Sequence, residues 1–145
     1  MKREYILLML LILAIFLNGC TGGAVITSAD GVKVENTIKE YYLALNDQNW
    51  SKAKNYCIYG SELYNEVIKL ENIVDANPYC ITVIAIYPTI LDYGFNDDGL
   101  FTCVNCYIND FSTVCGININ NIQSYNIYLH LQKIGNSWKL YEKHE

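Results

Sequence analysis

The amino-acid sequence predicts one α+β domain, in which helices from the N-terminal half pack on an antiparallel sheet from the C-terminal half. The chain has 145 residues, 52% of them hydrophobic and 17% charged, which is the balance of one globular domain. Apolar residues recur every three to four positions up to about residue 74, whereas β-branched and aromatic residues dominate from residue 79. Helices that precede strands, rather than alternate with them, indicate an α+β fold.

The N-terminus has the pattern of a secretory signal peptide. Lys2 and Arg3 are followed by an unbroken apolar run of 12 residues, from Ile6 to Leu17. As a helix this run is about 18 Å long, against about 30 Å for the hydrocarbon core of a bilayer. The run is therefore too short to span a membrane, and residues 1–19 are expected to be a signal peptide.

The end of this segment, Leu17-Asn18-Gly19-Cys20, resembles the lipobox of prokaryotic lipoproteins. The resemblance implies cleavage before Cys20 and a thioether-linked lipid on its sulfur. Asn18 departs from the family pattern, which has a small or apolar residue there. The alternatives are an ordinary cleaved signal peptide and an uncleaved anchor. With a lipid on Cys20, residues 20–31 form a tether and the domain lies on the extracytoplasmic face of the cell membrane.

Three helices are expected before residue 76. Apolar periodicity predicts the first over 34–46, the turn residues 47–49 end it, and a short second helix follows over 50–57. Ser61 is a residue type that caps helices, so a third helix begins after it. The expected buried face of this third helix consists of Leu63, Val67, Leu70 and Val74.

Strands are expected from residue 79 onward. The first covers 79–93 and is broken or bulged by Pro88. The turn sequence Asn96-Asp97-Asp98-Gly99 leads into a second strand over 100–108, and a third covers 114–119. The final hairpin runs over 125–133 and 138–141, and Gly135-Asn136 forms its turn. Its first strand is expected to have one apolar face, formed by Tyr125, Ile127, Leu129 and Leu131.

The chain resembles the NTF2-like superfamily, and more narrowly its small membrane-lipoprotein members. The resemblance rests on the opening helix 35–45, the break at 47–49, the restart at Trp50-Ser51-Lys52-Ala53 and the closing Trp138-Lys139-Leu140-Tyr141. It covers about residues 32–74 and 125–142, and it implies a cone over 32–145, with a curved sheet around helices and a pocket between them. The superfamily contains enzymes and non-enzymatic binding domains, and no catalytic motif of the family matches this sequence.

Five cysteines follow Cys20, and all are candidates for disulfide bonds because an exported chain meets an oxidising setting. They are Cys57, Cys80, Cys103, Cys106 and Cys115. Because five is odd, at least one thiol stays unpaired or pairs with another chain. The sequence alone leaves the pairing open.

The Cys-x-x-Cys spacing of Cys103 and Cys106 favours two other interpretations, a redox site or, with Cys80 and Cys115, a structural zinc site. A redox thiolate is expected at the start of a helix, whereas the flanking residues predict a strand. In a regular strand an offset of three places the two sulfurs on opposite faces. One Cys-x-x-Cys is also only half of the usual zinc signature.

No catalytic residue is assigned from the sequence. His130 is out of phase with Leu129 and Leu131, so it is expected on the opposite face and enters the pocket only if that face lines the cone. His144 is expected to be solvated. Asp92 is the other candidate for a titratable pocket residue. The chain has 13 tyrosines, which are expected to pack in the core and sheet, or to line a ligand pocket or a protein-contact face.

These patterns predict a membrane-anchored extracytoplasmic lipoprotein with a non-catalytic domain that binds a small apolar ligand or an envelope protein. Ten Lys and Arg against fifteen Asp and Glu give a net charge of −5, which excludes a basic nucleic-acid-binding surface. No cofactor and no metal are predicted. The alternatives are an enzyme that uses the NTF2-like pocket, and a redox or zinc protein that uses Cys103 and Cys106.

Overall fold

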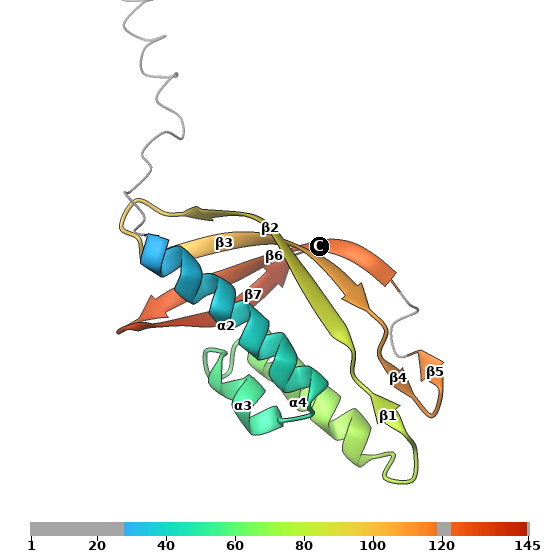
Figure 1. Cartoon of the computed structure of the whole chain (residues 1–145). Helices are drawn as coiled ribbons and strands as arrows, with labels where there is room; N and C mark the ends of the chain where they lie inside the picture. The colour runs from blue at the N-terminus through green and yellow to red at the C-terminus, as the bar shows by residue number, and fades with distance from the viewer. Residues whose placement is uncertain (1–27, 119–122, 145) are drawn as a thin grey trace, which may run out of the picture.

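The computed structural model of the chain describes residues 28–118 and 123–144, and in this part helices precede strands as predicted (Figure 1). The helices are α2 (Ser28–Asn46), α3 (Trp50–Asn55) and α4 (Glu62–Asp75). The strands are β1 (Thr82–Val83), β2 (Ile86–Phe95), β3 (Phe101–Asp110), β4 (Thr113–Val114), β5 (Ile117–Asn118), β6 (Gln123–Ile134) and β7 (Ser137–His144).

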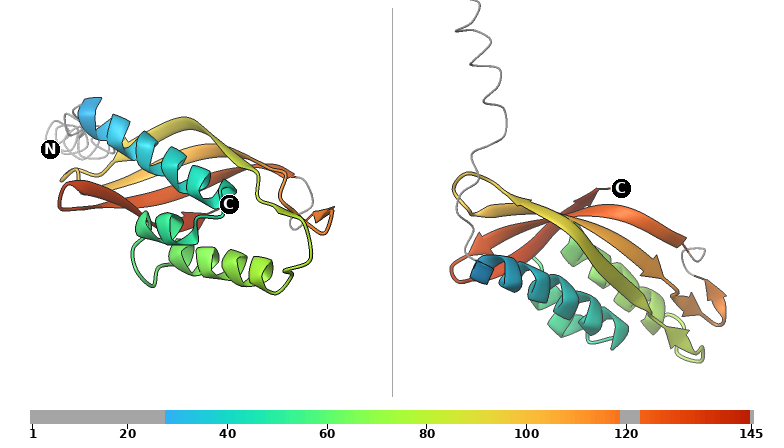
Figure 2. Two further views of the ribbon diagram at one scale, coloured as in Figure 1. Left: turned by 60° about the horizontal axis from the view of Figure 1, so that its bottom comes forward. Right: turned by 45° about the horizontal axis from the view of Figure 1, so that its top comes forward.

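The strands form two antiparallel sheets, a large one in the order β2-β3-β6-β7 and a small one in the order β1-β4-β5. All three helices lie against one side of the large sheet, so its two faces differ (Figure 2). The face toward the helices is its inner face, and the other is its outer face. The core forms where α2 and α4 meet the inner face, and it includes Ile38, Leu45, Val67, Ile108 and Leu129.

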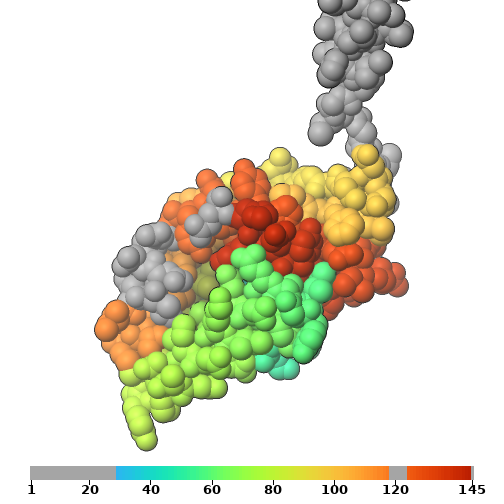
Figure 3. All heavy atoms as spheres, turned by 180° about the vertical axis from the view of Figure 1, so that it is seen from behind, coloured from blue at the N-terminus to red at the C-terminus, as the bar shows by residue number. Residues whose placement is uncertain are grey.

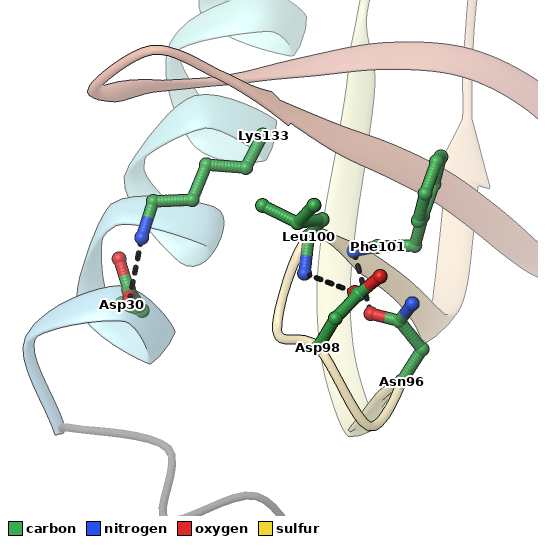
Figure 4. Close-up of polar contacts among 6 residues, drawn as sticks. All are labelled: Asp30, Asn96, Asp98, Leu100, Phe101 and Lys133. Carbon is green, nitrogen blue, oxygen red and sulfur yellow. Dashed lines mark hydrogen bonds and ion pairs between the residues drawn. The ribbon is translucent and has the colours of Figure 1, made fainter.

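Helix α2 begins at Ser28, so residues 28–31, which were expected in the tether, form its first turn. Apolar periodicity did not predict this turn, because a polar contact rather than an apolar side chain holds it against the sheet. The carboxylate of Asp30 accepts a hydrogen bond from Nζ of Lys133 at 3.1 Å, which fastens the start of α2 to the end of β6 (Figure 4). Lys133 also lowers the pKa of Asp30 from its ordinary value. Residues 28–31 therefore belong to the folded domain rather than to the tether.

The second helix ends two residues earlier than predicted. α3 stops at Asn55, and Cys57 instead pairs with Leu140 in an isolated parallel bridge to β7. The backbone N–H of Ile58 donates to the Leu140 carbonyl at 2.8 Å. The prediction for the third helix is confirmed, because the Ser61 side chain accepts from the backbone N–H of Tyr64 at the start of α4.

The prediction that Pro88 breaks or bulges the first strand is wrong. Pro88 lies within β2, in register with Ile108, and β2 is an edge strand, where a missing N–H is tolerated. The bulge falls instead between Ile90 and Asp92. It shifts the alternation of β2 by one residue, so that Tyr93 packs on the inner face.

Residues 114–119 were expected to form one strand, and the structure instead contains a tight hairpin of β4 and β5. Cys115 and Gly116 lie between these strands with φ of 54° and 75°. Two consecutive residues with positive φ reverse the chain direction, as in a tight two-residue hairpin. A cysteine at such a position is not a turn signal, and this is why the prediction failed.

The two expected turns of the large sheet are confirmed. Between β2 and β3, the side chain of Asn96 accepts from the backbone N–H of Phe101 at 2.8 Å, and that of Asp98 from the N–H of Leu100 at 2.9 Å (Figure 4). Gly99 follows with φ of 67°. Gly135 supplies the positive φ in the turn between β6 and β7. The apolar face predicted for 125–131 is the inner face of β6.

Candidate functional site

A pocket of about 240 Å³ lies between α2, α4 and the large sheet. It opens on the side seen from behind the molecule, where α4 borders the sheet (Figure 3). The helices contribute Tyr41, Tyr42, Leu45, Leu63, Glu66, Lys69, Leu70 and Ile73. The strands and the segment after β3 contribute Ile86, Asp110, Ser112, Tyr125, Ile127 and Lys143.

Apolar side chains form about half of the pocket walls. Leu45, Leu63 and Ile127 are buried and come from three different elements, α2, α4 and β6. Ile73, at the last turn of α4, is partly exposed and lies where the pocket meets solvent. Apolar walls of this kind hold an apolar group of a ligand by removing its surface from water.

One ion pair and one buried carboxylate contribute to the polar part of the pocket. Oε1 of Glu66 and Nζ of Lys143 form an ion pair at 2.9 Å. Asp110 is buried, with only 3% of its surface exposed, and its Oδ1 accepts from the backbone N–H of Ser112 at 2.8 Å. These groups offer hydrogen bonds to a ligand that carries a polar end.

Tyr41 and Tyr42 add neutral hydroxyl groups. Burial raises the pKa of each well above its ordinary value of 10.0, and nearby acidic groups act in the same direction. Both phenols are therefore protonated at neutral pH. Their rings pack edge to face, with centroids 5.1 Å apart.

The titratable residues singled out from the sequence do not meet in this pocket. His130 lies on the outer face, as its phase predicts, and that face does not line the pocket; its Nε2 is 3.9 Å from Sγ of Cys103. Asp92 is on the exposed outer side of β2. Two acids do line the pocket, Glu66 and Asp110, and no motif in the sequence singles out either of them.

Cys80 and Cys115 form a disulfide bond, whereas Cys57, Cys103 and Cys106 are free thiols. The disulfide joins the segment after α4 to the turn between β4 and β5. The sulfurs that it uses are not available as zinc ligands. In the described ranges, 28–118 and 123–144, no three His, Cys, Asp or Glu residues are arranged to hold a metal ion.

The redox interpretation of Cys103 and Cys106 also fails on geometry. Cys106 is buried on the inner face of β3 and Cys103 lies on the outer face, as an offset of three requires. Burial raises the pKa of the Cys106 thiol to about 12 and raises that of Cys103 as well. A redox-active thiol has the opposite shift.

Cys20, with the signal peptide and most of the tether, lies outside the described residues. Of the helices within those residues, none is both long enough and apolar enough to cross a bilayer. Lipid attachment at Cys20 stays a prediction from the sequence.

The sequence matches no known family model and no curated protein. Among solved structures, the intermembrane-space region of the chloroplast protein ARC6 is similar to this chain with a TM-score of 0.59 at 11% identity, over 77% of this chain and 92% of that one. A Nostoc punctiforme protein of unknown function with a cystatin-like fold is similar over 81% and 90%, with a TM-score of 0.52 at 9% identity.

Bd1075 of Bdellovibrio bacteriovorus is similar as well, with a TM-score of 0.54 at 11% identity over 82% of this chain. This chain spans only 42% of Bd1075. At such identities the similarities concern the fold alone. They confirm the predicted α+β fold of helices on a curved antiparallel sheet, of the cone-like type.

Proposed function

We propose that this protein is an extracytoplasmic lipoprotein whose domain binds a small amphipathic molecule in the pocket between α2, α4 and the sheet, without catalysis. The observation that carries the proposal is the composition of the pocket. Apolar side chains from α2, α4 and β6 line it, and its polar groups include an ion pair, a buried carboxylate, the ammonium group of Lys69 and two protonated phenols. Such a set orients a ligand that has one apolar and one polar end.

The size of the pocket supports a small ligand. At about 240 Å³ it is slightly below the range of about 300–1,000 Å³ that is usual for small-molecule sites. The Glu66–Lys143 ion pair joins α4 to β7 beside the pocket, and so helps to keep these two walls at a constant distance.

The disulfide supports an extracytoplasmic location. Disulfides persist in oxidising compartments and are rare in the cytosol. The Cys80–Cys115 bond therefore agrees with the export that the signal-peptide pattern predicts. The lipobox resemblance supplies the anchor, through Cys20.

Ligand binding is tested with the neutral amphipathic dye N-phenyl-1-naphthylamine, whose fluorescence rises when it leaves water. We expect saturable binding to the wild-type protein. Ile73→Trp places a large ring at the mouth of the pocket and is expected to weaken binding about tenfold. Asn72→Trp is the matched control, because Asn72 is the preceding exposed residue of α4 and does not line the pocket. Equal dye binding by both variants, or none by the wild type, would refute the pocket.

The anchor is tested by phase partitioning in Triton X-114 after expression in a bacterial host. The wild-type protein is expected in the detergent phase and Cys20→Ser in the aqueous phase. Cys103→Ser, which changes a free thiol of the folded domain, is the control and should partition like the wild type. Retention of Cys20→Ser in the detergent phase would exclude the lipobox interpretation.

A further inference from the structure

No helix covers the outer face of the large sheet (Figure 2). The strand register places three tyrosines in a diagonal line across this face. Tyr87 of β2, Tyr107 of β3 and Tyr128 of β6 are 56%, 37% and 45% exposed. In the strand register Tyr107 stands opposite Thr89 on β2 and Asn126 on β6, so Tyr87 and Tyr128 are each two residues away, in opposite directions. Side chains related in this way are about 7–8 Å apart. We call these three residues the tyrosine line.

Each member of the tyrosine line has an asparagine directly opposite it on a neighbouring strand. The pairs are Tyr87 with Asn109, Tyr107 with Asn126, and Tyr128 with Asn105. An asparagine amide offers two donors and one acceptor. The outer face therefore repeats one unit, an aromatic ring beside an amide, on three successive rows of the sheet.

The hydrogen-bonding state of these amides leaves capacity for a ligand. Oδ1 of Asn109 accepts one hydrogen bond, from the Ser124 hydroxyl at 2.7 Å. Oδ1 of Asn105 is covered by its neighbours and has no hydrogen-bond partner in the described part of the chain. Asn126 is exposed. A hydroxyl-bearing ligand on this face can pair with the amides of Asn109 and Asn126, whereas the covered Oδ1 of Asn105 is out of its reach.

The charge of this face restricts what can bind there. The tyrosine line and its three asparagines are uncharged. The ionisable residues beside them are Asp92 opposite Asn105, His144 opposite Tyr128, and Glu142, whose Oε2 is 3.6 Å from Nε2 of His144. Carboxylates at the margin repel anionic polymers such as nucleic acids and anionic lipid surfaces. A neutral ligand meets no such penalty.

We propose that the tyrosine line is a binding surface for a neutral polysaccharide. The C–H face of a pyranose ring packs on an aromatic ring, and its hydroxyl groups pair with amides, so a row of ring-and-amide units matches successive sugars. A second copy of this chain fits less well, because the centres of homodimer interfaces are more apolar and this one would bury three amides. The surface is separate from the ligand pocket, and its binding does not depend on the proposed function.

The test is co-sedimentation of the full-length protein, purified in detergent, with insoluble chitin and with cellulose. The wild type is expected to sediment with at least one of them, and to do so equally at 0.1 M and 0.5 M NaCl, because no charge pairing is involved. Tyr107→Ala is expected to weaken binding roughly two- to tenfold, as the loss of one ring contact implies. Tyr107→Trp, which keeps a ring, should retain binding.

Tyr79→Ala is the matched control, because Tyr79 is fully exposed and lies outside the sheet. The thermal unfolding temperature and dye binding in the pocket should be unchanged in Tyr107→Ala. Weaker sedimentation then reports a change at the outer face and not unfolding or damage to the pocket. Failure of the wild type to sediment with either polymer, or equal sedimentation of Tyr107→Ala, would overturn the proposal. A dimer in analytical ultracentrifugation that Tyr107→Ala dissociates would assign the face to self-association instead.

Discussion

The inner and outer residues of β3 share one backbone and the same ladder of hydrogen bonds, yet their surroundings differ. Val104, Cys106 and Ile108 have no exposed surface and pack beneath the helices. Between them, Asn105 and Tyr107 alternate onto a face that no helix covers. Since folding buries only the inner set, the outer set is under little constraint from stability. The two faces should therefore respond very differently to substitution.

The largest effect is expected from truncating the inner face. Leu129→Ala removes a fully buried side chain of β6 and should lower the free energy of unfolding by about 2–5 kcal/mol. Its neighbour Tyr128 points outward, and Tyr128→Ala should change the same quantity by less than about 1 kcal/mol. Urea denaturation followed by circular dichroism measures both. Similar losses for the two variants would mean that the outer face is also packed.

In the small sheet, the disulfide is expected to contribute more to the free energy of unfolding than side-chain burial does, in contrast to the large sheet. Cys80→Ser opens a loop of 35 residues and is expected to lower the free energy of unfolding by about 2–4 kcal/mol. The bond holds a two-residue hairpin that contributes little to the core, so constraint of the unfolded chain dominates its effect. Urea denaturation of the oxidised protein, of Cys80→Ser and of Cys115→Ser tests this. The two variants should agree, and a difference between them would indicate that one serine is strained in the folded state.

One substitution can be made on both faces of the same strand. Cys106→Ser places a hydroxyl in the apolar core and should destabilise the protein by about 1–3 kcal/mol. Cys103→Ser, three residues earlier on the outer face, should be close to neutral. In the folded protein, iodoacetamide should also modify Cys103 long before Cys106. Equal modification rates would contradict their placement on opposite faces.

The buried thiols make stability depend on alkaline pH. Burial raises the pKa of Cys57 and Cys106 from 9.0 to about 12 in the folded protein. Below pH 9 this contribution is fully present; above it, the unfolded chain loses these protons first, so stability falls as the pH rises toward 12. From pH 8 to 10 each thiol should lower the free energy of unfolding by about 1.4 kcal/mol.

Tyr41 and Tyr42, whose pKa values burial also raises, act in the same direction. The contribution of one thiol is therefore isolated by repeating the measurement with Cys106→Ala, whose decrease from pH 8 to 10 should be smaller than that of the wild type. Cys103→Ala, which removes a thiol from the outer face, is the control. A pH dependence unchanged in Cys106→Ala would show that its thiol is not buried as described.

Caps, turns and the two faces of a strand could be predicted from the sequence, because residues close together in the chain determine them. The cap at Ser61, the turn at Gly99, the inner face of β6 and the opposite faces of Cys103 and Cys106 follow from contacts within a few residues. The first turn of α2 was missed because its attachment, from Asp30 to Lys133, spans 103 positions. The bulge after Ile90 was missed because it depends on the register with β3.

The sequence by itself determined the α+β class and which residues of β3 and β6 alternate onto which face, and its N-terminal pattern predicts export and a lipid on Cys20, because these depend on periodicity and on short motifs. Only the tertiary structure decided that Cys80 pairs with Cys115, and that Glu66 and Lys143 meet beside a pocket that also contains Asp110. It also aligned the tyrosine line across three strands. The physical reason is that strand register and helix docking are selected by burial of the whole core, which no short segment of sequence encodes.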